Sequence, residues 1–117
     1  MRHGNKVKKF NRTRKVRAGL MKSLIVALVD QKSIKTTEAK AKALRPMIEK
    51  IVTQAKKNNV GAKRVIEAKL GSKKMAEKIV TEFGKKFDGR EGGYTRIIKL
   101  PKRLKDAASM ARIEFID

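Results

Sequence analysis

Cysteine is absent from this chain of 117 residues, and histidine occurs once, as His3. The protein can therefore form no disulfide, no thiolate metal site and no thiol nucleophile, and a single histidine cannot build a histidine cluster. Long apolar stretches are also missing, because the longest run is Leu24 to Val29 and a membrane-spanning helix needs about 20 apolar residues. We therefore expect no metal or thiol chemistry and no transmembrane segment.

The motifs of common catalytic sites are missing as well. The sequence contains no GxxxxGK phosphate loop, no GxSxG, no HExxH and no glycine fingerprint behind a strand. Its five aromatic residues are scattered, without the RNP-type motif of sheets that stack single-stranded bases. We expect a protein that is not an enzyme and that has no cofactor and no small-molecule substrate.

Acidic residues are few in comparison with basic ones. Lysine and arginine number 32 against 11 aspartates and glutamates, which gives a net charge of +21. Charge of one sign at this density destabilises a compact state through self-repulsion, so we expect a polyanion to supply the counter-charge. The candidates are nucleic acid and anionic lipid, and the lack of a spanning segment disfavours the membrane.

Basic residues are densest in residues 1–17, which hold eight lysines and arginines, no acid and too few apolar side chains to fold alone. This segment lacks the apolar core and cleavage site of a signal peptide, so we expect it in the mature protein and the protein in the cytoplasm. We predict a basic RNA-binding extension over residues 1–17 and a single globular domain over residues 18–117. A solvated, disordered tail is the alternative.

RNA phosphates could each accept one of these cations and release counterions, which is the main source of nucleic-acid affinity. Phe10 is expected to pack against the body, with stacking on a base as the alternative. The predicted RNA-binding residues of the extension are Arg2, His3, Lys6, Lys8, Lys9, Asn11, Arg12, Arg14, Lys15 and Arg17.

The first element predicted after the extension is a buried helix from about Arg12 to Gln31. Apolar residues recur at helical spacing from Val16 to Leu28, and the run is apolar on most sides. The short, partly β-branched segment Ser33–Thr37 then separates two helical patterns. We predict a strand there, with an extended linker as the alternative.

The strongest periodic pattern belongs to a second helix that opens at Glu38, beside a threonine that can cap its free amides. Leu44, Met47 and Ile51 follow at helical spacing and are predicted to be core residues. Proline lacks an amide hydrogen, so Pro46 predicts either a bend in this helix or a new helix that starts at Pro46.

Two shorter helices and a β-hairpin complete the predicted fold. Ala62–Leu70 forms the third helix, and the fourth ends at Gly84, where a left-handed terminating residue is expected. Tyr94–Leu100 and Met110–Ile116 favour strands, and in the second of them apolar and charged residues alternate. The predicted fold class is α+β, in which about four helices pack with a small, mostly antiparallel sheet.

Gly92 and Gly93 precede the first strand of the hairpin and indicate a tight turn into it. The alternative is a close approach of RNA, because glycine lets backbone amides come near a phosphate. Arg90, Tyr94 and Arg96 would then surround that phosphate with hydrogen-bond donors. These three residues are therefore further RNA-binding candidates.

Five stretches of the sequence fall into a recognisable order, namely MRH at Met1–His3, IKTT at Ile34–Thr37, AKAKALRP at Ala39–Pro46, GGYTRI at Gly92–Ile97 and MARIEF at Met110–Phe115. Through them the chain closely resembles the family of the bacterial large-subunit ribosomal protein numbered seventeen, along its whole length. The sequence departs from the family in a less arginine-rich HGNKVKKF region. It also has Ala108-Ser109-Met110 where the family often has Ala-Pro-Met.

The resemblance implies an α/β domain with an extended basic N-terminus, bound to large-subunit ribosomal RNA on the solvent side near the peptide exit. It also implies neighbouring large-subunit proteins as partners and a place in cytoplasmic ribosomes. The residues that match recurring family positions, and so are candidates for RNA or protein contacts, are Arg2, His3, Asn11, Arg12, Lys35, Arg45, Tyr94 and Arg96.

Two other classes of function fit less well. A nucleoid-type DNA-binding protein would share the charge, but the sequence has no clear recognition helix in helix-turn-helix spacing. A small RNA-modifying enzyme would need a cofactor motif, which is missing. We therefore predict a structural component of the large ribosomal subunit that neutralises folded RNA segments and holds them in position.

Overall fold

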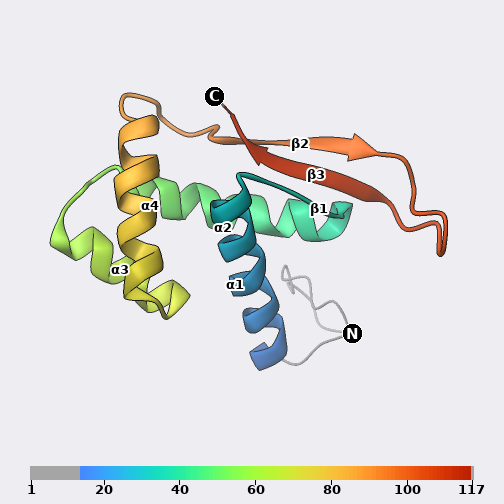
Figure 1. The fold of residues 1–117 in the computed structure, drawn as a ribbon, viewed down its shortest axis with the longest axis horizontal. Coiled ribbons are helices and arrows are strands. Elements are labelled where there is room, and N and C mark those ends of the chain that lie inside the picture. The colour runs from blue at the N-terminus through green and yellow to red at the C-terminus, as the bar shows by residue number, and fades with distance from the viewer. Residues whose placement is uncertain (1–13, 117) are drawn as a thin grey trace, which may run out of the picture.

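The computed structural model describes residues 14–116, which form four helices and one three-stranded sheet (Figure 1). In chain order the elements are α1 (Arg14–Gln31), β1 (Ser33–Thr37), α2 (Glu38–Ala55), α3 (Val60–Leu70), α4 (Lys73–Lys86), β2 (Thr95–Leu100) and β3 (Met110–Phe115). This arrangement confirms the predicted α+β class. The residues of the basic extension before Arg14 lie outside the described part of the chain.

The sheet has the order β1-β3-β2, and both neighbouring pairs are antiparallel. Its centre is the row in which Ile113 of β3 lies between Ile34 of β1 and Ile97 of β2. Ala111, Ile113 and Phe115 are buried, whereas Arg112 is exposed. The predicted strand at Ser33–Thr37, the antiparallel hairpin and the alternation in its second strand are thus confirmed.

Helix α2 is the centre of the fold, because it contacts every other helix and strand. It lies along the sheet in Figure 1, with α3 and α4 at the end of α2 that is remote from the β2–β3 loop. Its buried residues are Ala41, Leu44, Ile48, Ile51, Val52 and Ala55. Pro46 lies inside this single helix, so the alternative of a new helix starting at Pro46 is wrong.

Capping side chains fix where the later helices begin. The capping residues are Thr37 for α2, Asn59 for α3 and Ser72 for α4. The Asn59 side chain accepts a hydrogen bond from the Ala62 amide at 2.8 Å, so α3 starts at Val60 rather than at the predicted Ala62. Gly71 follows α3 in a left-handed conformation, with φ of 69°.

Three details of the predicted helices are wrong. Met47 is 40% exposed rather than buried, because it stands at the edge of the apolar stripe of α2. Val16 is 54% exposed, because α1 buries residues only from Met21 onward and its first turns extend beyond the core. Gly84 lies inside α4 rather than at its end. A Cβ atom at this position would come within 2.8 Å of the Ala55 carbonyl oxygen. This glycine therefore allows α4 to pack closely on the end of α2.

Candidate nucleic-acid interface

The structure distributes the predicted RNA-binding residues over three places. The first turns of α1 carry Arg14, Lys15 and Arg17; the sheet carries Lys35 and Arg96; and the junction between α2 and β2 carries Arg45, Arg90 and Tyr94. The remaining predicted residues, Arg2, His3, Lys6, Lys8, Lys9, Asn11 and Arg12, lie outside the described residues.

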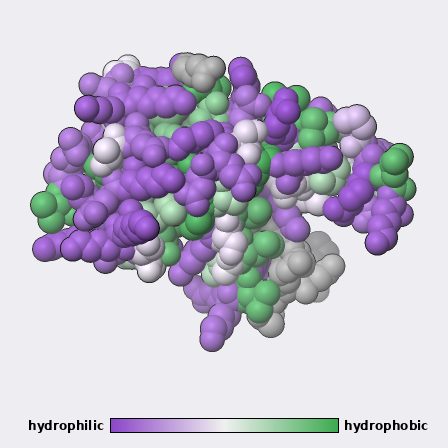
Figure 2. Space-filling view, viewed as in Figure 1, coloured by the Kyte–Doolittle hydropathy of each residue, from purple (hydrophilic) through white to green (hydrophobic). Residues whose placement is uncertain are grey.

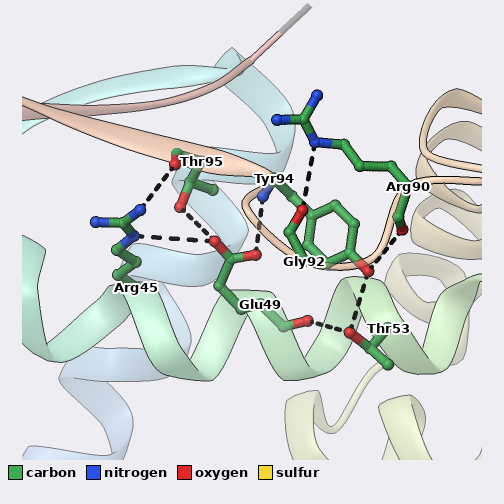
Figure 3. Close-up of polar contacts among 7 residues, drawn as sticks. All are labelled: Arg45, Glu49, Thr53, Arg90, Gly92, Tyr94 and Thr95. Atoms are coloured by element: carbon green, nitrogen blue, oxygen red, sulfur yellow. Dashed lines mark hydrogen bonds and ion pairs between the residues drawn. The ribbon is translucent and has the colours of Figure 1, made fainter.

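Glu49 connects α2 to the beginning of β2 (Figure 3). One of its carboxylate oxygens accepts a hydrogen bond from the Tyr94 amide at 3.0 Å, and the other accepts one from the Thr95 hydroxyl at 3.2 Å. Arg45, one turn earlier on α2, lies 3.9 Å from the same carboxylate and donates to the Thr95 carbonyl at 3.4 Å. Nothing in the sequence distinguishes Glu49, because an acidic residue on a helix carries no local sign of a partner on a distant strand.

The turn before β2 is built from Gly92 and Gly93, whose φ angles are 82° and 63°. Both values lie in the left-handed region that glycine adopts without strain. Arg90 folds back over this turn and donates from its Nε to the Gly92 carbonyl at 3.3 Å (Figure 3). The tight turn predicted from the two glycines is confirmed, while a close approach of RNA to it stays a prediction.

Tyr94 is a core residue, with only 1% of its surface exposed. Its hydroxyl donates to the Arg90 carbonyl at 3.2 Å and lies 3.3 Å from the Thr53 hydroxyl, while the Lys56 ammonium donates to it at 3.2 Å. Burial acts to raise the pKa of Tyr94, but the hydrogen bonds, above all the one with Thr53, outweigh burial and lower the pKa. Tyr94 therefore offers neither ring nor hydroxyl to a partner, and serves instead to hold the turn against α2.

The side of the sheet that faces away from the core carries more cations than acids. The register places Lys35 opposite Arg112, and Arg96 opposite Glu114. The Glu114 carboxylate accepts hydrogen bonds from Arg96 at 2.9 Å and from Arg112 at 3.1 Å, and the pair with Arg96 is the main reason why the pKa of Glu114 is lowered. No ion pair is formed by Lys35 with any described residue. We call this surface the outer sheet face.

A groove of about 1000 Å³ lies between α1 and α2 and is bordered by the end of α3. We call it the α1–α2 groove. Its apolar floor is formed by Ala18, Met21, Ile25, Ala39, Ala43, Pro46, Met47, Ile51 and Leu70. Among residues 14–116, its basic residues are Arg14, Arg17, Lys22, Lys42, Lys50 and Lys69, and its one acidic residue is Glu38. Figure 2 shows hydrophobic side chains along α1 within an otherwise largely hydrophilic face.

Glu38 is already neutralised by its neighbours. Its carboxylate lies 2.9 Å from the Lys42 ammonium and 3.8 Å from that of Lys99, and the hydrogen bond with Lys42 is the main reason why the pKa of Glu38 is lowered. A second hollow, of about 470 Å³, shares Lys50 and Lys69 with the groove and continues toward Gly92 and Gly93. The two hollows are thus neighbours, and Lys50 and Lys69 border both of them.

Several of these cations were not among the predicted site residues. Arg112, Lys22, Lys42, Lys50 and Lys69 lie on the outer sheet face or around the groove. In the sequence they resemble ordinary solvated lysines and arginines of helices and strands. Only the packing of α1 on α2, and of three strands in one sheet, brings them together.

The described residues hold no group of three or more histidine, cysteine, aspartate or glutamate side chains that could bind a metal ion. Within residues 14–116, no helix has the length and apolar character needed to cross a membrane.

Comparison with known proteins yields one consistent family. The sequence model described as ribosomal protein L17 matches residues 20–116. The chain is 44% identical to the large ribosomal subunit protein bL17 of Hydrogenobaculum sp., with 100% of both chains covered. It is 46% identical to the protein of the same name from Rickettsia bellii, over 100% of this chain and 82% of the relative. The corresponding protein of Campylobacter jejuni is 47% identical, with 99% of both chains covered.

Proposed function

We propose that this chain, which belongs to the ribosomal protein L17 family, is a structural, RNA-binding component of the bacterial large ribosomal subunit. The observation that carries the proposal is the identity of 44–47% to large-subunit proteins along practically the whole chain. In this role its partners are large-subunit ribosomal RNA and neighbouring ribosomal proteins. It works in the cytoplasm, within the ribosome, and catalyses no reaction.

The charge of the chain supports RNA as the main partner. The net charge of +21 means that the chain has far more lysines and arginines than acidic residues to neutralise them. On α1, neither Arg14 nor Lys15 forms an ion pair with a described residue. Phosphates supply the missing negative charge, and each neutralised phosphate releases counterions.

The basic residues position RNA rather than read its sequence. Contacts to phosphates fix the register and orientation of a nucleic acid without distinguishing bases, and the planar guanidinium of arginine can bind a phosphate with two hydrogen bonds. Beyond residues 1–17, the contacts that we propose come from Lys35, Arg45, Arg90 and Arg96. Glu49 and Tyr94 support this surface from within by holding the turn that carries Arg90 against α2.

The salt dependence of RNA binding tests the mechanism. Filter binding of the purified protein to large-subunit RNA should weaken on the order of a thousandfold between about 50 and 200 mM salt, if about six phosphates are neutralised. Duplex DNA of the same length serves as a competitor that separates RNA binding from general affinity for polyanions. An affinity that is insensitive to salt would contradict the phosphate mechanism, and preferential binding to DNA would favour a nucleoid role.

A further inference from the structure

The floor of the α1–α2 groove leaves apolar surface uncovered. Met47 is 40% exposed, although it stands next to the buried Ile48 and one turn before the buried Ile51. Pro46 and Ala39, which also line the groove, are exposed as well. Contiguous apolar surface that is surrounded by polar residues usually marks a binding site. Methionine suits such a site, because its unbranched, polarisable side chain adapts to irregular partners.

The rim of the groove selects for a negatively charged partner. Of the six cations that the described residues contribute, only Lys42 forms an ion pair, and its partner Glu38 is the one described acid of the groove. The other cations, from Arg14 on α1 to Lys69 on α3, stand beside a low-dielectric apolar floor, which strengthens their field. The occupant must therefore combine apolar surface with several negative charges.

An RNA strand has both properties, because its bases present apolar faces and its backbone carries a charge at every phosphate. A second copy of this chain would bring further positive charge, since the net charge is +21. The groove also begins at Arg14 and Arg17, the last cations of the basic extension. RNA bound to Arg14 and Arg17 would thus already lie at the groove.

Only an unpaired nucleotide can use the apolar floor. In an A-form duplex the bases are stacked and paired, and side chains contact mainly phosphates and 2′-hydroxyls, whereas loops and bulges can turn a base outward. The groove volume of about 1000 Å³ is large enough for at least one base. We infer that the α1–α2 groove binds an unpaired RNA nucleotide, with its base on the floor around Met47 and its phosphates at the rim cations. This inference rests on the proposed function and adds a preference for RNA with bulges or loops.

The test compares two RNA hairpins, one with an unpaired uridine bulge and one from which the bulge is removed. The full chain is bound to each by filter binding at one fixed salt concentration, together with Met47→Gln and its control Val65→Gln. Val65 of α3 is 39% exposed, nearly the same as Met47, but does not line the groove. Both variants should fold, because both residues are partly exposed and glutamine is a good helix former; circular dichroism checks this.

The parent protein should bind the bulged hairpin about fivefold more tightly than the paired one, because a base on the apolar floor removes apolar surface from water. Met47→Gln should lose this preference and keep its affinity for the paired hairpin, while Val65→Gln should behave like the parent. Thiouridine in the bulge should crosslink to the peptide that contains Met47.

Other outcomes overturn the inference in distinguishable ways. Equal binding of both hairpins by the parent would refute the groove site and leave the proposed function intact. A preference that survives in Met47→Gln, or crosslinks confined to residues 1–13, would place the unpaired base elsewhere. A dimer that dissociates in Met47→Gln, detected by analytical ultracentrifugation, would make the groove a contact between two copies. Failure to bind either hairpin at low salt would count against the proposed function itself.

Discussion

Glu49 shows how one side chain can determine the geometry of a surface that it does not itself form. Its two oxygens accept hydrogen bonds from the Tyr94 amide and the Thr95 hydroxyl, and these bonds attach the start of β2 to the central helix. Neither donor has another partner that could replace the carboxylate among the described residues. The turn that leads into β2 carries Arg90, whose Nε donates to the Gly92 carbonyl.

Replacing Glu49 by glutamine should therefore destabilise the fold. The amide group of glutamine offers one acceptor where the carboxylate offers two, so one donor loses its partner, at a cost of about 1–2 kcal/mol in the free energy of unfolding. Urea titration measures this difference. The control is Glu77→Gln on α4, an exposed carboxylate that forms no ion pair within residues 14–116 and whose replacement should change stability little. Equal stability of the two variants would show that Glu49 does not hold the strand.

The pair of Glu114 with Arg96 makes stability depend on pH. The pKa of Glu114 is lowered from its ordinary value of 4.5, chiefly by the hydrogen bond from Arg96. A carboxyl whose pKa is lower in the folded state stabilises the fold at pH values above 4.5, and this contribution is lost as the pH falls through the folded-state pKa. Glu114→Gln should be less stable than the parent near neutral pH, and the difference should shrink toward about pH 3. Urea titrations at the two pH values measure it, and a constant difference would contradict the assigned pair.

At the scale of elements, local pattern predicted what each segment forms but not always which residues it buries. The alternation in MARIEF gave the correct inner and outer faces of β3, because a strand has only two faces. A helix has no such sharp division, so Met47 at the margin of its stripe was assigned to the core and is in fact exposed. The central place of β3 between β1 and β2 depends on contacts between distant segments, and local patterns contain no information about it.

In the candidate site, too, local features could be predicted from the sequence, whereas contacts between distant elements could not. The basic character of α1 and the glycine turn before β2 were predictable, because each depends on residues that are adjacent in the sequence. The α1–α2 groove was not, because its rim combines α1, α2 and the end of α3. Tyr94 was expected to contact RNA, yet its ring fills the core, where it lies against Phe87 with ring centroids 5.1 Å apart.

Two glycine variants test the packing of α4 on α2. A Cβ atom at Gly84 would approach the Ala55 carbonyl oxygen to 2.8 Å, so Gly84→Ala should destabilise the fold by about 1–3 kcal/mol despite its better helix propensity. At Gly19 in α1 a Cβ atom meets nothing within 4 Å, so Gly19→Ala should stabilise by about 0.5–1 kcal/mol. Thermal unfolding of both variants measures these changes. A stabilised Gly84→Ala would show that the two helices are not in close contact there.

At the scale of the whole molecule, a net charge of +21 remains after every acidic residue has been counted against a lysine or arginine. Lys78 is one of the cations that are paired, since it lies 2.7 Å from Asp30, and this hydrogen bond raises its pKa. Lys15 on the first turn of α1 is exposed and has no acidic partner among residues 14–116. Two cations of equal charge thus differ in whether they are free to meet a phosphate.

This difference predicts how each lysine affects the salt dependence of RNA binding. Lys15→Ala should reduce the slope of log affinity against log salt by about one unit, because one counterion-releasing contact is removed. Lys78→Ala lowers the net charge by the same amount and should leave the slope unchanged. Filter binding over a series of salt concentrations measures both slopes. Equal reductions would mean that overall charge, rather than particular contacts, determines the affinity.

Sedimentation of the protein in a cell lysate tests its ribosomal role most directly. The lysate is separated on a sucrose gradient, and the chain is quantified in each fraction by mass spectrometry. We expect it to sediment with large subunits and intact ribosomes, in constant proportion to other large-subunit proteins, and to be scarce in the free soluble fractions. A predominantly free pool, or sedimentation with chromosomal DNA, would contradict its role as a structural component of the large subunit.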